Sequence, residues 1–261
     1  MRTGTALKLT RSPLILVLAQ IRFSPVLRMA DFVPEIQEAM RKERLVRFNR
    51  EETQQLVFGG NSMTSNQSVR WVFGNREKTE SVILAQDFFI FQVSKYDMFE
   101  TFLEKLLDLF EVVTGAVELS FASQIGLRYL DLVKPLDGLN VDEFIKPELR
   151  GLTAKDLKAT SSLHQFVIQS QTDVGALSIR SYENQGGQFL PPDLQTDHLK
   201  FNVQSVNEFR ILDFDHFSKQ EVDIERGSLE ERLWSLHDAT STAFTAATTE
   251  DAMRTWQKEK Q

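Results

Sequence analysis

The spacing of apolar residues along the chain changes between a continuous run, a period of two and a period of 3.6. Residues 14–23 form an apolar run with the length of a buried strand. Val69, Trp71 and Phe73 occupy every second position, which is typical of a half-buried strand. Residues 97–113 repeat apolar side chains at the 3-4 spacing of an amphipathic helix. The mixture predicts an α+β protein.

The first part of the chain predicts the order strand, helix, four strands, helix. Asp31 can cap the first helix, with Pro34 within its first turn. Asp97 and Glu100 have the spacing of a capping box at the start of the second helix. We expect strands at 14–23, 54–58, 69–73, 80–84 and 88–93.

The second part repeats this order. A short helix is expected at 141–149, and Asp173 with Gly175 can join two strands as a hairpin. Ser228 can cap a long C-terminal helix, and Thr248 can begin a second helical segment. We expect strands at 124–133, 163–171, 174–182, 199–206 and 209–214.

The repeated order β-α-β-β-β-β-α predicts two related halves, at 12–115 and 116–261, or one continuous domain. A weak similarity between residues 19–23 and 123–129 supports a duplication. Each half would pack its helices on one face of an antiparallel sheet and leave the other face solvated or free for binding. This order resembles the saddle of the TATA-binding protein, but a shared topology does not carry function.

Composition narrows the classes of function. The net charge is −7, so the basic surplus typical of nucleic-acid binders is missing and such binding is a minor alternative. The chain has no cysteine, which excludes disulfides and thiolate chemistry. The 20 Phe against 3 Tyr and 3 Trp indicate side chains that fill a core. A polar, mildly basic face of the second sheet is expected from Gln165, Gln169, Ser178, Arg180, Lys200, Asn202, Gln204 and Arg210.

The N-terminal region resembles a signal peptide only faintly. Arg2, Lys8 and Arg11 precede the apolar run, but no small-x-small cleavage site follows it. No other stretch approaches the roughly 20 apolar residues of a membrane helix. We therefore expect a buried strand here and a cytoplasmic protein.

Asp213, Asp215 and His216 form the densest group of chemically active residues. Strand alternation would place the two carboxylates on one face, where they could hold a hard cation such as Mg²⁺, with His216 on the opposite face. A strand end with Asp capping backbone amides is the structural alternative. We predict no metal site and no cofactor, because no zinc, phosphate-loop or nucleophile motif is present.

Arg22 and Arg128 occupy matching places in the proposed repeat. Each guanidinium can pair with a buried carboxylate or contact an anionic ligand. His237 follows Leu236 at the margin of the buried face of the final helix, where a packing role and a catalytic role are both open. With Asp213, Asp215 and His216, these residues are the candidate binding site.

Four stretches together resemble a sporadically distributed, uncharacterised family of prokaryotic proteins of about this length. The resemblance covers nearly the whole chain and implies an accessory or defence-type role in bacteria, without an activity or site residues. It rests on residues 16–25, 124–129 and 212–217, and on Leu236-His237 followed by Phe244.

The leading functional prediction is a non-enzymatic binding protein that presents a sheet face, or the cleft between its halves, to a protein partner. One alternative is a small-molecule sensor with an apolar pocket under the helices. The other is a metal-dependent nuclease or hydrolase that uses Asp213, Asp215 and His216. Sequence leaves the oligomeric state open.

Overall fold

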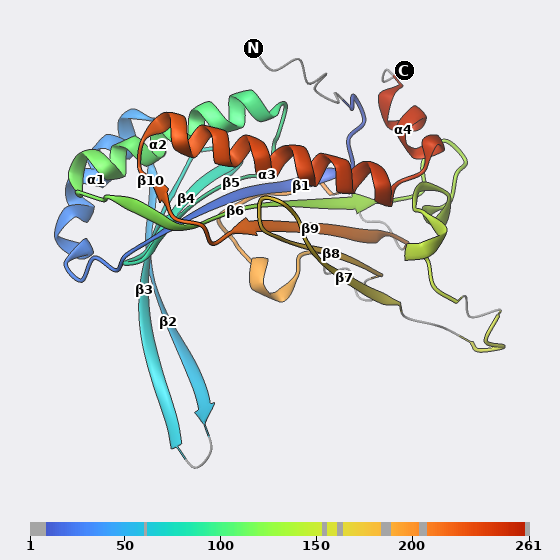
Figure 1. Cartoon of the computed structure of the whole chain (residues 1–261), viewed down its shortest axis with the longest axis horizontal. Helices are drawn as coiled ribbons and strands as arrows, with labels where there is room; N and C mark the ends of the chain where they lie inside the picture. The colour runs from blue at the N-terminus through green and yellow to red at the C-terminus, as the bar shows by residue number, and fades with distance from the viewer. Residues whose placement is uncertain are drawn as a thin grey trace.

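A computed structural model describes residues 9–59, 62–152, 156–160, 164–183, 189–203 and 208–258. Ten antiparallel strands form one sheet, and helices lie along one face of it (Figure 1). The strands are β1 (Leu14–Phe23), β2 (Arg47–Gly59), β3 (Ser62–Gly74), β4 (Glu80–Leu84), β5 (Phe88–Val93), β6 (Phe121–Val133), β7 (Gln165–Gln171), β8 (Ala176–Glu183), β9 (Arg210–Ser218) and β10 (Val222–Asp223). The helices are α1 (Met29–Lys42), α2 (Phe99–Ala116), α3 (Arg226–Ala247) and α4 (Glu250–Gln257), with 3-10 turns η1 (Val141–Phe144), η2 (Pro147–Leu149) and η3 (Pro192–Leu194).

The strands follow the order β2-β3-β4-β5-β1-β6-β9-β8-β7, with β10 also paired to β6. The pairing of β1 with β6 therefore joins a strand from each predicted half at the centre of the sheet. The β2–β3 hairpin pairs over its full length, from Arg47 with Gly74 to Gly59 with Ser62. Since β4 pairs with β3 only from Trp71 to Gly74, the rest of this hairpin extends beyond the sheet (Figure 1).

The predicted strands 14–23, 80–84 and 88–93 match β1, β4 and β5, and the long C-terminal helix is also present. The prediction of a cap at Asp31 is wrong, because α1 begins at Met29 after a turn in which the Met29 N–H donates to the Val26 carbonyl. The long C-terminal helix, α3, begins at Arg226, two residues before the cap predicted at Ser228. Thr249, one residue after the predicted second start, caps α4 by accepting from the Ala252 N–H.

Two predicted elements of the second part differ from the structure. Residues 141–149 form two 3-10 turns and not one helix, because Pro147 lacks a backbone donor and holds the residue before it extended. Residues 199–203 belong to no strand, although their apolar side chains alternate as in a strand. Residues 204–206, the end of that predicted strand, lie outside the described residues.

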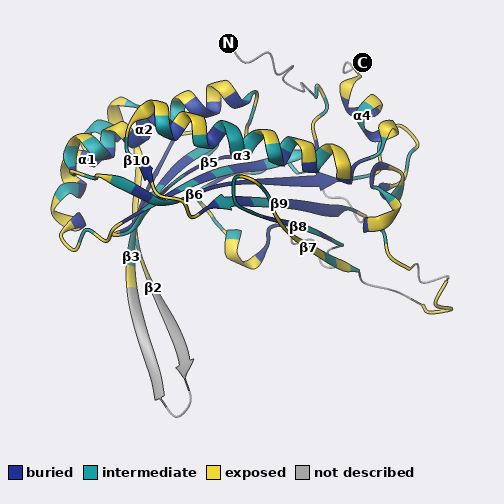
Figure 2. Ribbon diagram, viewed as in Figure 1, coloured by how far each residue is buried: buried dark blue, intermediate teal, exposed yellow. Residues whose placement is uncertain are grey.

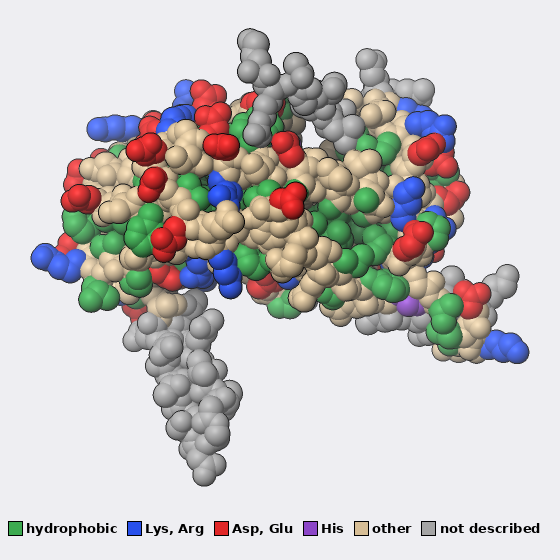
Figure 3. Space-filling view, in the orientation of Figure 1, with side chains coloured by type: hydrophobic (Ala, Val, Ile, Leu, Met, Phe, Trp, Pro, Cys, Tyr) green, Lys and Arg blue, Asp and Glu red, His purple; other side chains and the backbone are tan. Residues whose placement is uncertain are grey.

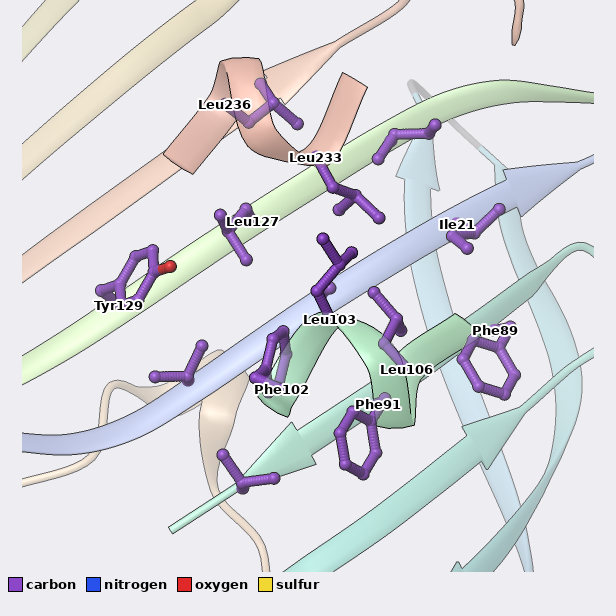
Figure 4. Close-up of a cluster of buried hydrophobic side chains, with 14 of the residues drawn as sticks. Ile21, Phe89, Phe91, Phe102, Leu103, Leu106, Leu127, Tyr129, Leu233 and Leu236 are labelled. Atoms are coloured by element: carbon purple, nitrogen blue, oxygen red, sulfur yellow. The ribbon is translucent and has the colours of Figure 1, made fainter. Parts of the chain in front are cut away.

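The main core lies between the sheet and the helices. Side chains from β1, β5 and β6 point toward α2 and α3, whose apolar faces carry Leu103, Leu106, Leu233 and Leu236 (Figure 4). Phe91 and Phe102 stack with their ring centroids 5.2 Å apart. The central strands are buried while the helices expose their outer faces (Figure 2). Phe therefore fills this core, as the composition predicts. Of the described helices, none is long and apolar enough to cross a bilayer.

A second, smaller core lies on the sheet face opposite the helices. It is covered by residues 189–203, which we call the strap; this segment runs beneath the sheet in Figure 1. Leu190 and Leu199 of the strap pack against Leu16, Leu130 and Ile211 of the sheet. The face that sequence predicts to be solvated or open is therefore partly covered by a segment that has no strand pairing.

Asp131 is buried on the helix side of β6, where its register partner is Leu212. Burial raises its pKa to about 8, and Asp213 adds to the shift. The folded state therefore holds a proton that the unfolded chain releases above its ordinary pKa of 3.8. Stability should fall as the pH rises from about 4 to about 8, and it should level off above that range.

We predict that Asp131→Asn abolishes this dependence and stabilises the fold by about 2 kcal/mol at pH 7, since the amide has no charge to bury. Urea unfolding between pH 4 and pH 9 measures the effect. The exposed Asp223→Asn change is the control and should leave the profile as in the wild type. Parallel profiles for Asp131→Asn and the wild type would contradict the prediction.

Candidate functional site

Three neighbouring strands bring charged side chains together on the sheet face that the strap covers. In the register of β6, β9 and β8, Arg128 lies opposite Asp215, and Arg180 lies opposite Asp213. Antiparallel partners project from the same face, so these four side chains converge. Asp193 lies in the η3 turn of the strap and approaches these side chains from the strap.

Arg128 is the centre of this group, and its guanidinium makes three short hydrogen bonds. Its Nε and Nη2 donate to the two carboxylate oxygens of Asp213, each at 2.7 Å. Its Nη1 donates to Asp193 Oδ2 at 2.5 Å. Arg180 Nη1 also donates to Asp213, at 2.9 Å. We call Arg128, Arg180, Asp193, Asp213 and Asp215 the ionic cluster.

The two carboxylates that hold Arg128 differ in their access to water. The Asp213 side chain is completely buried, and that of Arg128 is 8% exposed. The Asp193 side chain is 63% exposed. A fixed ion pair in the sheet is thus completed by a carboxylate that solvent reaches freely. Removing Asp213 would leave the buried Arg128 cation without its main partner. The Asp193 carboxylate can move away from Arg128 and keep its charge in water.

The other carboxylates of the cluster have shifted pKa values. Burial raises the pKa of Asp215, and the positive charges of Arg128 and Arg180 oppose that shift only in part. Partial burial is the largest influence on Asp193 and works against its ionisation, but the hydrogen bond and the positive charge of Arg128, with the charge of Arg180, together outweigh it and lower the pKa. Asp193 therefore stays charged at neutral pH and holds the strap to Arg128.

Two hydroxyl groups beside the cluster have no hydrogen-bond partner among the described residues. They are Ser178 Oγ and Tyr182 OH, and both atoms are buried. Ser178 lies opposite Asp215 in the register, and Tyr182 lies two residues beyond Arg180 on the same face. A buried hydroxyl without a partner costs about 1–3 kcal/mol, so these groups mark a place where a further polar group would be favourable.

The candidate residues named from sequence do not all meet in one site. Arg128, Asp213 and Asp215 meet in the ionic cluster. Arg22 projects from the same face, but it pairs with Asp87 at 2.9 Å, and its guanidinium lies 5.5 Å from the centre of the Phe88 ring. Arg22 and Asp87 thus form a guanidinium–carboxylate pair on this face that is separate from the ionic cluster.

His216 lies on the opposite, helix-side face, so it does not converge with Asp213 and Asp215. It is completely buried, with Nδ1 3.2 Å from the Leu236 carbonyl and Nε2 2.9 Å from Thr172 Oγ1. The carbonyl can only accept, so Nδ1 carries the proton and Nε2 accepts from the hydroxyl. Burial lowers the pKa of His216, which agrees with a neutral ring.

His237 also lies on the helix side, in an aromatic group between α2 and α3. Its ring stacks on Phe99 with centroids 4.0 Å apart, and its Nδ1 is 2.7 Å from the Tyr129 hydroxyl. Burial lowers the pKa of His237 and raises that of Tyr129. Both groups are neutral at physiological pH, and their packing agrees with the structural alternative.

A second polar group attaches the strap to the other half of the sheet. His198 Nε2 lies 2.6 Å from Glu51 Oε1, and the ligand atoms of Glu51, Asp197 and His198 lie within 4.8 Å of one another. This spacing is compatible with a metal ion. However, Arg70 Nη2 already contacts Glu51 Oε2 at 3.1 Å, so the geometry supports an attachment of the strap more directly than a metal centre.

Sequence reasoning missed Asp193 as a site residue, and it misplaced Arg210. Asp193 follows Pro191 and Pro192 in a loop, and no local pattern connects it with Arg128, 65 positions away. Arg210 was expected on the outward face, but it is 1% exposed on the other face and donates to the Leu149 carbonyl at 2.8 Å. The register of β6 and β9 determines the face on which Arg210 lies, whereas the contact of Asp193 with Arg128 depends on how the strap folds over the sheet.

No protein family, curated protein or solved structure matched the chain in comparisons of sequence and structure. The resemblance to the prokaryotic family therefore stays a prediction.

The ionic cluster makes a quantitative prediction about its two carboxylates. Arg128→Met should destabilise the protein by about 3–5 kcal/mol, because Asp213 keeps a buried charge with one partner fewer. Asp193→Asn should cost about 1 kcal/mol or less, because its side chain returns to water. Urea unfolding of both variants at pH 7 measures this difference. Equal losses would show that Asp193 is as integral to the fold as Arg128.

Proposed function

We propose that this protein is a non-enzymatic binding protein that recognises an anionic group, a carboxylate or a phosphate, at the ionic cluster beneath the strap. The observation that carries the proposal is the position of Asp193. Its exposed carboxylate occupies the third side of a buried guanidinium that is otherwise fixed by Asp213. An external anion of similar geometry could replace it, because Arg binds carboxylate and phosphate in the same bidentate manner.

The chemistry around Arg128 supports a ligand more than a reaction. Both oxygens of Asp213 accept hydrogen bonds from guanidinium groups, so neither is free to act as a base. Arg180 is 31% exposed and could contact the same ligand. The hydroxyls of Ser178 and Tyr182 supply two donors that lack partners among the described residues. Donors of this kind orient a bound anion without transferring a proton.

The strap is suited to act as a movable cover. Its apolar side chains, among them Leu190 and Leu199, pack on the second core, but no strand ladder holds it to the sheet. Among the described residues, its hydrogen bonds to the strands and turns of the sheet are few. Asp193 bonds to Arg128, His198 to Glu51, the Lys200 N–H to the Lys78 carbonyl, Lys78 Nζ to the Asp197 carbonyl and Ser94 Oγ to the Lys200 carbonyl. A segment with few backbone hydrogen bonds opens at a lower free energy than the sheet beneath it. Loss of the Asp193 contact on ligand binding would release the middle of the strap.

We further propose that the two halves are structurally related. In each half the first strand, β1 or β6, pairs with the last strand of the following meander, β5 or β9. Arg22 and Arg128, at the matching places, project from the same sheet face. The second half differs in that its ionic pair is covered by the strap. Under this proposal the binding site arose by modification of one half.

A surface hollow supports small-molecule binding as a second candidate function. It lies between α1 and the base of the β2–β3 hairpin and has a volume of about 420 Å³, within the usual size range of ligand sites. Val33, Phe48 and Trp71 line it with apolar surface, and Gln37 and Arg50 add polar groups. The hollow is open to solvent and lies beside α1, so it differs from the enclosed pocket expected under the helices.

Asp193→Asn provides the test, because it removes the internal competitor for Arg128 while keeping the strap. Thermal shift against carboxylic acids, phosphate and nucleotides should identify a ligand that binds this variant about fivefold more tightly than the wild type. Asp197→Asn is the matched control, since it makes the same charge change on the strap at a side chain that is 90% exposed. It should bind as the wild type does.

Arg180→Gln should weaken the same ligand. Native mass spectrometry of protein purified from its host tests for a ligand outside the panel. The proposal fails if neither experiment finds a ligand, or if Asp193→Asn binds no more tightly than Asp197→Asn.

A further inference from the structure

Strand β7 ends the sheet with an edge that lacks the usual protection against strand pairing. Six of its seven residues are exposed. Among the described residues, β7 pairs with β8 along one edge and with no strand along the other. The strand reads Gln-Phe-Val-Ile-Gln-Ser-Gln and contains no charge, proline or glycine. Natural sheets normally protect an edge with charged residues, proline or bulges, because unpaired backbone groups attract further strands.

At the other edge of the sheet, the first part of β2 shows that protection. Residues 47–52 include Arg47, Arg50, Glu51 and Glu52, whereas residues 53–59, which belong to the projecting part of the hairpin, carry no charge. The whole chain is 26% charged, so an uncharged edge strand departs from its average. Charges of both signs are mixed over the face of the molecule shown in Figure 3. The difference between β2 and β7 indicates that the β7 edge is an interaction surface.

The ladder between β7 and β8 determines which backbone groups face outward. The Thr172 N–H donates to the Gly175 carbonyl, and the Glu183 N–H donates to the His164 carbonyl. Hydrogen-bonded pairs alternate along an antiparallel ladder, so the even-numbered residues of β7 bond to β8. The odd-numbered residues direct their N–H and C=O groups away from the sheet. These outward residues are Gln165, Val167, Gln169 and Gln171.

We propose that β7 pairs antiparallel with β7 of a second copy of this chain, so that two sheets join into one. A twofold axis at Ile168 would place Gln165 opposite Gln171 of the second copy, and Val167 opposite Gln169. This register uses every outward N–H and C=O group of the strand in both copies. No like charges meet across the junction, because the strand has no charged side chain.

The same axis also accounts for the exposed apolar side chains of β7. Ile168 is 42% exposed and Val167 is 51% exposed, on opposite faces of the strand. In the proposed pairing Ile168 packs directly against Ile168 of the second copy, and Val167 is covered by the stem of Gln169. A twofold contact of this kind is closed and self-complementary, so it predicts a dimer and not a fibre. The ionic cluster faces the strap and lies outside the junction.

Sedimentation equilibrium of the full chain tests the pairing. One strand junction buries little area, so we expect a dimer with a dissociation constant of about 10 µM. Ile168→Lys and Ile168→Glu should each dissociate at least about tenfold more readily, because like charges would meet on the axis. An equimolar mixture of the two variants should form a heterodimer, since Lys and Glu then face each other.

Val46→Lys is the matched control, because Val46 is 46% exposed immediately before the opposite edge strand and should leave the dimer intact. Thermal unfolding of each variant establishes that it is folded. A wild-type chain that stays monomeric up to about 300 µM would overturn the proposal. It would also be overturned by a dimer that both Ile168 variants leave unchanged, or by a mixture that fails to restore association.

Discussion

The antiparallel pairing of β1 with β6 is the constraint on which the rest of the structure depends. It joins the strands of the two predicted halves into a single sheet and fixes which side chains of β6 face each side. Tyr129 thereby points to the helices, and Arg128 points to the strap. Both faces of these central strands are covered. A shift of the strand register by one residue would therefore turn Arg128 toward the main core and Tyr129 toward the strap.

Placing Arg128 in a covered face creates a requirement for negative charge. Asp213, on the neighbouring strand, satisfies two of its donors, and Asp193 satisfies a third. The strap thus completes an electrostatic pairing that the sheet begins, while its Leu190 and Leu199 add apolar contacts. One segment therefore closes the second core and places Asp193 on Arg128. Under the proposed function, an anion that replaces Asp193 would thereby loosen the cover of the sheet.

Much of the fold could be predicted from local pattern, whereas the site could not. Residues 14–23 were recognised because a centrally buried strand is apolar on both faces. The strand expected at 199–206 is absent over residues 199–203, because Leu199, Phe201 and Val203 alternate in the strap and pack on the second core without a ladder. Arg128 meets Asp213 through a register that spans 85 positions, which no local spacing encodes.

The proposed function requires that the strap opens independently of the sheet that it covers. Hydrogen–deuterium exchange of the wild-type protein, followed by mass spectrometry of peptides, measures this directly. If the strap opens on its own, amides of residues 189–203 exchange much faster than those of β6 and β9 and respond separately to low concentrations of denaturant. If the strap exchanges only with global unfolding, at the rate of β6 and β9, it is a fixed part of the fold and cannot give way to a ligand at Arg128.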